Sequence, residues 1–219
     1  MAVRIETTPP DHRRFWPSAR HVRAKKDGAV VVDSRAVLLV WEPGKPVPFY
    51  AFPETDVAAG VRTRRWDDAE LHGYVRIPWS DADHWYEEDE EVFVHPRDPF
   101  KRVDAIQSSR HVVVAIGGEV VADTRRPVLV FETALPTRHY FLRDDVRMDL
   151  LEPSARTTGC AYKGTASYWS VGDERDVAWC YPESVIPAIE GLVAFFDERV
   201  EVTVDGEAQE RPVTQWSRG

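Results

Sequence analysis

Hydrophobic residues along this chain come in short runs that turn signals interrupt. The runs are rich in Val, Leu, Phe, Tyr and Trp, and turns such as Gly117-Gly118 and Asp205-Gly206 separate them. Helical periodicity covers only residues 145–151 and 183–189, and Pro187 weakens the second segment. The pattern predicts a mainly β fold, a small sandwich or barrel with few short helices. In the second half of the chain, the expected strands are 111–116, 119–123, 127–132, 139–141, 167–171, 177–181, 193–196 and 200–204.

The chain contains the same blocks twice, in the same order and at the same spacing. A series of matches in constant register indicates an internal duplication. We therefore expect two small β domains, a degenerate copy over residues 1–94 and a complete copy over residues 95–219, because the blocks restart near residue 95. The blocks are SARHV (18–22), GAVVVDSR (28–35) and LLVWE (38–42), which return as SSRHV (108–112), GEVVADTR (118–125) and VLVFE (128–132).

Composition and charge exclude several classes of protein. With 219 residues, 43% of them hydrophobic and 11% aromatic, the chain is neither disordered, collagenous nor a disulfide scaffold. A net charge of -9 opposes attraction to phosphate backbones, so we expect no nucleic-acid partner. The sequence has no apolar stretch of the roughly 18 residues that span a bilayer and no apolar leader at its start. We expect no membrane partner and a cytoplasmic location, and the oligomeric state stays open.

One segment, TGCAYKGTASYW (158–169), has no counterpart in the first copy and concentrates reactive side chains. Lys163 follows Cys160 by three residues, and a nearby ammonium favours a thiolate. We take Cys160, Lys163 and Tyr140 as candidate catalytic residues. Alternatives stay open: Cys160 could be a buried structural thiol, and Lys163 could bind an anion, form a Schiff base, or pair with Glu132 or Asp145.

The candidate ligand-binding residues lie on predicted strands around this segment. Strand alternation places Arg138 and Tyr140 on one face and His139 on the other. Glu132 and Asp145 correspond to Glu42 and Asp56 in the first copy, which favours an architectural role for both acids. Aromatic residues on strands usually pack inward. The full set of ligand-binding candidates is Arg138, Tyr162, Tyr168, Glu132, Asp145 and Trp179.

No metal or other cofactor is expected. The two cysteines, Cys160 and Cys180, are too few for a four-cysteine zinc site and lack the C-x-x-C spacing. A nucleotidyltransferase would need acidic residues to hold Mg²⁺, and the only candidates are 81–83 and 144–145.

At the level of motifs, the second copy resembles a known family. The segments RPVLVFE (126–132), LPTRHYF (135–141), TGCAYKGTASYW (158–169) and AWCYP (178–182) are together similar to the domain of unknown function 427 family, which also has a nucleotidyltransferase-like name. The resemblance covers residues 95–207, and residues 18–94 resemble a degenerate copy. It implies a compact tent-like β fold of two roughly orthogonal sheets and no established reaction. Leu142 and Ala161 stand where the family usually has proline.

Three functions remain in view. The first is a domain that binds or converts a small molecule with an anionic or carbonyl group, with its pocket in the C-terminal copy. The second is a non-catalytic interaction module, in which the aromatic content serves packing. The third is a nucleotidyltransferase-like protein that binds a nucleotide.

Overall fold

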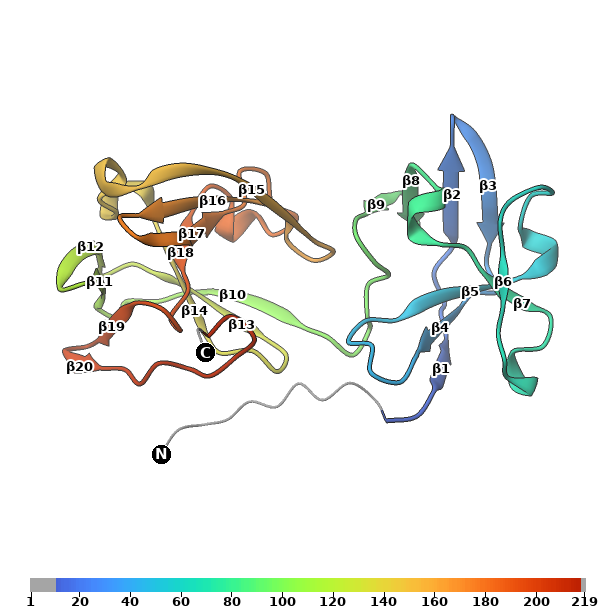
Figure 1. The fold of residues 1–219 in the computed structure, drawn as a ribbon, viewed down its shortest axis with the longest axis horizontal. Coiled ribbons are helices and arrows are strands. Elements are labelled where there is room, and N and C mark those ends of the chain that lie inside the picture. Colours follow the sequence, from blue (N-terminus) through green and yellow to red (C-terminus); the bar gives the residue numbers. More distant parts are fainter. Residues whose placement is uncertain (1–10, 218–219) are drawn as a thin grey trace. The chain divides into compact units, whose positions relative to one another are not determined.

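A computed structural model describes residues 11–217 of the protein (Figure 1). The described chain forms two compact units, one over residues 11–99 and one over residues 100–217, and each contains one set of the repeated blocks. Every assigned regular element is a β-strand or a single turn of 3-10 helix. The predicted mainly β fold is therefore confirmed.

The N-terminal unit consists of two antiparallel sheets. One has the strand order β1-β4-β5-β7-β6 and the other β3-β2-β8-β9. In Figure 1 the β2–β3 hairpin runs across the direction of β5. The strands are β1 (Arg14–Pro17), β2 (Val22–Lys26), β3 (Ala29–Ser34), β4 (Leu38–Trp41), β5 (Phe49–Pro53), β6 (Arg64–Arg65), β7 (Tyr74–Arg76), β8 (His84–Glu87) and β9 (Glu90–Val92), with 3-10 turns η1 (Glu54–Asp56), η2 (Ala69–Leu71) and η3 (Trp79–Asp81).

The C-terminal unit repeats this plan with a larger main sheet. That sheet has seven strands in the order β10-β13-β14-β18-β17-β16-β15, and the smaller one has the order β12-β11-β19-β20. The strands are β10 (Val103–Gln107), β11 (Val112–Ile116), β12 (Glu119–Thr124), β13 (Val128–Glu132), β14 (Arg138–Phe141), β15 (Glu152–Cys160), β16 (Gly164–Val171), β17 (Glu174–Cys180), β18 (Val193–Phe195), β19 (Glu201–Val204) and β20 (Glu207–Ala208), with 3-10 turns η4 (Arg143–Asp145), η5 (Met148–Leu150) and η6 (Pro187–Ile189).

Strand register confirms the duplication. Val22 pairs with Ser34 as Val112 pairs with Thr124, and both hairpins shift register at the same place. In the main sheets, Leu39 pairs with Tyr50, as Leu129 pairs with His139. Positions in the two units can therefore be matched through their pairing partners.

The helices expected over residues 145–151 and 183–189 are wrong, and single 3-10 turns occupy parts of both segments. Val146 forms a β-bridge with Ala122, and the backbone N–H of Arg147 donates to the carbonyl of Val121 at 2.8 Å. This pairing with β12 holds Val146 in an extended conformation, at φ -121° and ψ 136°, which a helix through this residue does not allow. In the other segment, Pro187 has no N–H to donate and begins the 3-10 turn η6.

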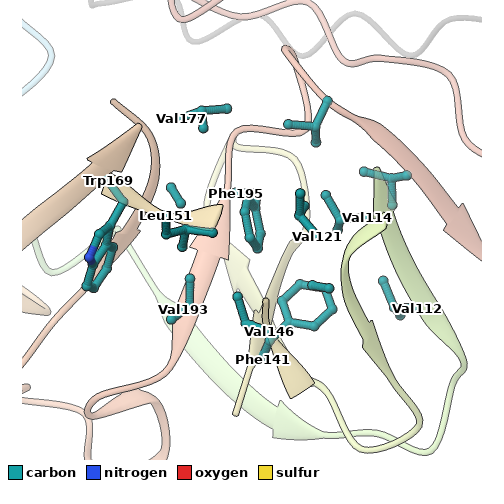
Figure 2. Packing of buried hydrophobic residues seen from close by; sticks show 14 of the residues in the cluster. Val112, Val114, Val121, Phe141, Val146, Leu151, Trp169, Val177, Val193 and Phe195 are labelled. Carbon is teal, nitrogen blue, oxygen red and sulfur yellow. The ribbon is translucent and has the colours of Figure 1, made fainter. Parts of the chain in front are cut away.

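The main core of the C-terminal unit lies between its two sheets. Figure 2 shows Phe141 and Phe195 at its centre, beside Val121 and Val146. The two phenyl rings meet edge to face with centroids 5.9 Å apart. We call the face of the seven-stranded sheet toward this core the inner face. A second cluster covers the opposite, outer face and includes Val128, Val130, Tyr140, Ala166, Tyr168, Trp179, Tyr181, Ile189, Ala194 and Phe196.

The outer face is where the two units differ most. In the N-terminal unit the matching cluster has only Val40, Ala51, Trp66 and Leu71 as its buried members. Ala51 stands where the C-terminal unit has Tyr140, and nothing matches the β15–β16 hairpin. The outer face of the seven-stranded sheet thus carries a larger buried cluster than the matching face of the N-terminal unit, where Trp66 is the one buried aromatic member.

Candidate functional site

The outer face of the seven-stranded sheet brings together most residues that the sequence singles out. Tyr140 comes from β14, Tyr168 from β16 and Trp179 from β17, and all three are buried. Cys160 ends β15 and is half-buried against the same cluster. Lys163 lies in the turn that joins β15 to β16. Within each strand, the two-residue alternation of side chains places Tyr140, Tyr168 and Trp179 on this face.

Lys163 forms a buried ion pair with Glu132 of β13. The ammonium contacts the Glu132 carboxylate, and the two side chains are only 8% and 12% exposed. Of the alternatives that the sequence left open, the structure shows the pairing with Glu132 and not with Asp145. The ammonium also lies 5.5 Å from the centroid of the Tyr181 ring. Since burying an ion pair has a high desolvation cost, this pair is an unusual component of an aromatic sheet face.

The backbone around Lys163 is held in place by the segment that follows β17. The Lys163 carbonyl accepts hydrogen bonds from the Ser184 hydroxyl at 3.0 Å and from the Val185 N–H at 3.3 Å. Gly164 has φ +103°, and a Cβ at this position would lie 2.9 Å from the Glu183 carbonyl oxygen. Only glycine allows so close an approach. Gly164 therefore lets the Lys163 turn pack directly against the backbone of Glu183 and Ser184.

Two buried phenols flank the ion pair. The Tyr140 hydroxyl accepts a hydrogen bond from Trp179 Nε1 at 3.2 Å. Burial raises the pKa of Tyr140, and the Glu132 carboxylate adds to the rise. Burial likewise raises the pKa of Tyr181. Both phenols are therefore protonated at neutral pH and can donate hydrogen bonds.

The cluster holds more hydrogen-bond donors than acceptors. An ammonium has three donor protons, and Glu132 is the one hydrogen-bond acceptor of Lys163 within the described chain. The Tyr140 hydroxyl proton has no acceptor among the described residues, and the Tyr181 hydroxyl has no hydrogen-bond partner among them. This arrangement can accommodate an additional acceptor such as a carbonyl or carboxylate oxygen.

Arg138 lies on the same face but is fully engaged by protein groups. Its two terminal nitrogens donate to the Glu198 carboxylate at 2.7 and 2.6 Å. The guanidinium also lies 5.5 Å from the Trp216 ring centroid, and Thr214 donates to the same carboxylate at 2.6 Å. Arg138 thus ties the C-terminal segment to the outer face, while its role in ligand binding stays a prediction.

Asp145 does not join the cluster. It accepts from the Thr124 hydroxyl at 2.7 Å and from Arg126 at 3.0 Å, and Arg126 lowers its pKa. Asp56 accepts from Ser34 at the same distance, 2.7 Å, at the matching place in the other unit. The shared contact supports the architectural interpretation of this acid.

The remaining candidates lie near the cluster, and three neighbours were missed. Tyr162 is half-buried in the same turn as Lys163, and Tyr168 shares a hydrogen bond of 2.7 Å with the Thr158 hydroxyl. Tyr181 could have been found, because it follows Trp179 by two residues and so lies on the same strand face. Glu198 and Trp216 carried no comparable signal in the sequence.

The C-terminal unit has a hollow of about 380 Å³, but it lies on the inner face. His139, Leu129 and Phe131 line it from the main sheet, and Val202 lines it from β19. His139 Nδ1 lies 3.3 Å from an Asp197 oxygen. The candidate catalytic residues Cys160, Lys163 and Tyr140 do not line this hollow, and strand alternation turns Tyr140 to the opposite face.

Within residues 11–217, no group of three or more His, Cys, Asp or Glu side chains could hold a metal ion. Nor does that part of the chain contain a helix long and apolar enough to cross a membrane.

The duplicated sheets and the aromatic outer face define a tandem, mainly β domain protein with one elaborated copy. The chain belongs to the domain of unknown function 427 family, whose model matches residues 14–87 and 104–206 and so covers both copies. No match to a curated protein was found for this chain.

Proposed function

We propose that the C-terminal unit binds a small carbonyl compound at the outer face, beside Lys163 and Glu132. The observation that carries the proposal is the excess of donors in a buried, aromatic cluster. A ligand oxygen would satisfy donors that the described protein groups leave unmatched.

The charge balance favours a neutral acceptor over an anion. Glu132 already neutralises Lys163, so a carboxylate ligand would add an uncompensated negative charge to a buried site. A carbonyl oxygen adds no charge and accepts two hydrogen bonds. In this proposal Tyr181 and Lys163 donate to the ligand oxygen, Glu132 holds the ammonium, and half-buried Cys160 lies at the edge of the site.

The N-terminal unit cannot form this site. Ala51 replaces Tyr140, and the copy has no segment that corresponds to residues 158–169. Glu42, which matches Glu132, pairs instead with Arg13 at 3.2 Å. The proposal therefore assigns carbonyl binding to the C-terminal unit alone.

The test is a thermal-shift screen of the full chain against small ketones and aldehydes, each compared with the matching alcohol. A carbonyl compound at a hundred times its dissociation constant should stabilise the unit by about 2.7 kcal/mol. The same compound should slow the alkylation of Cys160 by iodoacetamide, and the alcohol should do neither. The effect should disappear in K163M/E132L, which replaces the ion pair by apolar groups and so avoids an unpaired buried charge. An unchanged shift in that folded variant would overturn the assignment.

A further inference from the structure

The N-terminal unit contains a hollow of about 540 Å³, within the size range of small-molecule sites. It opens among β5, β7, β8 and the segment that follows β9. Residues from all of these line it, including Phe49, Arg76, Trp85 and His95.

The two hollows lie at matching places in the duplicated fold. Tyr50 lines the first and His139 the second, and both pair with a leucine, Leu39 or Leu129, in the neighbouring strand. Trp85 and Val202 also match, since they pair with Ala24 of β2 and Val114 of β11. The fold therefore leaves the same end of the sandwich open in both copies.

The floor of the N-terminal hollow is a fixed aromatic stack. The Trp79 and Trp85 rings lie 4.8 Å apart at 16°, and Tyr50 lies 6.2 Å from Trp79 at 21°. Trp85 Nε1 donates to the Trp79 carbonyl at 3.0 Å, and the Tyr50 hydroxyl donates to Glu87 at 2.6 Å. Trp79 is the half-buried member of the stack. A planar ring can lie against it without rearrangement of the floor.

The wall of the hollow is positively charged. Lys45, Arg62, Arg64 and Arg76 all line it. Asp81 pairs with Arg62 at 2.6 Å. The other three cations have no ion pair within the described part of the chain, and the Arg76 guanidinium lies 5.2 Å from the Phe49 ring centroid and 5.1 Å from that of Trp66. In a protein of net charge -9, this hollow is a local exception that attracts anions.

The C-terminal hollow lacks both features. His139 and Asp197 stand there in place of Tyr50 and Trp79, and Val202 in place of Trp85. The combination of an aromatic floor and a cationic wall is therefore particular to the N-terminal copy.

We propose that the N-terminal unit binds a small aromatic anion in this hollow. The ring lies against Trp79, and the carboxylate or phosphate contacts Lys45, Arg64 and Arg76. This site is separate from the carbonyl site of the C-terminal unit and does not depend on it.

The probe is 1-naphthoate, titrated into the full chain by calorimetry, with 1-naphthalenemethanol as the neutral match. Naphthoate should bind at least about tenfold more tightly than the alcohol, since one charge-assisted hydrogen bond contributes that much. A second pair, AMP and adenosine, separates nucleotides from aryl carboxylates. Tighter binding of AMP than of naphthoate supports the nucleotide form of the proposal, and the reverse order supports the aryl carboxylate form.

Variants distinguish this hollow from other basic surfaces. K45A/R64A should weaken naphthoate binding by about tenfold or more, whereas K26A/R35A, which removes the same charge from exposed positions of the same unit, should change it by less than about twofold. K163M/E132L should leave the affinity unchanged, which separates this result from the carbonyl site. Equal affinities for naphthoate and its alcohol, or full affinity in folded K45A/R64A, would overturn the proposal.

Discussion

Replacing Arg138 by methionine should destabilise the C-terminal unit strongly. Arg138 and Glu198 are 4% and 0% exposed, and they are joined by two hydrogen bonds of 2.7 and 2.6 Å. R138M leaves the Glu198 carboxylate buried without its cation, and breaking a buried pair in this way costs about 3–5 kcal/mol. The double variant R138M/E198L removes both charges and should recover most of that loss, because an apolar pair has no charge to desolvate.

The pH dependence gives a second, independent signature. Burial alone would raise the pKa of Glu198, but Arg138 holds it below its ordinary value. In the wild-type protein this carboxylate therefore stabilises the fold above its unfolded pKa of about 4.3, and the contribution is lost as pH falls through the folded pKa. In R138M burial raises the pKa instead, so stability falls as pH rises above about 4.3. The cost of R138M should be larger at neutral pH than near pH 4.

Hydrogen exchange resolved by peptide measures this effect in each unit separately. The loss of protection should be confined to residues 100–217, with residues 11–99 as an internal reference. R126A is the matched control, because its pair with Asp145 is formed by an arginine that is 59% exposed and should contribute less than about 1 kcal/mol. A cost of R138M as small as that of R126A, with the same sign of pH dependence as wild type, would refute the reasoning.

Two further predictions concern single positions. G164A should destabilise the C-terminal unit by about 2 kcal/mol or more in urea unfolding, because of both the positive φ and the contact of the new Cβ with the Glu183 carbonyl. G206A, at φ +86° and with no atom within 4 Å of an added Cβ, should cost only about 1 kcal/mol. Equal costs would contradict the role of the close approach. Iodoacetamide should label half-buried Cys160 in the folded protein and leave Cys180 unlabelled until unfolding, because Cys180 is 0% exposed and burial raises its pKa. Mass spectrometry of the two peptides measures this, and equal rates in the native state would show the expectation to be wrong.

Strands with a buried, apolar face could be predicted from the sequence, and strands without one could not. The run at residues 111–116 reappears as β11, which packs in the main core. By contrast β15, Glu152–Cys160, is mostly exposed and polar, and was missed. Its strand conformation comes from pairing with β16, which no local pattern in residues 152–160 indicates.

The candidate site shows the same division between local and distant information. Alternation correctly separates Arg138 and Tyr140 from His139, because both faces belong to one strand. The sequence did not decide whether Lys163 pairs with Glu132 or with Asp145, because both acids lie on or next to strands of the C-terminal copy. The choice depends on which strand the β15–β16 turn reaches, and that is a property of the folded sheet.

The two copies differ on opposite faces of the same strand position, and comparison of the repeated sequences pointed only to the difference at the outer face. At the outer face, Tyr140 and the β15–β16 hairpin enlarge the hydrophobic cluster of the C-terminal copy. In the N-terminal copy, Ala51 contributes only a small side chain to the matching cluster. At the inner face the N-terminal copy is the more aromatic one, since Tyr50 belongs to an aromatic stack and the matching His139 does not. Consecutive residues of one strand point to opposite faces, so each copy could change one face while the other continued to support the fold. Comparing the copies residue by residue shows where they differ, and these differences are what our two proposals assign to two sites of different chemistry.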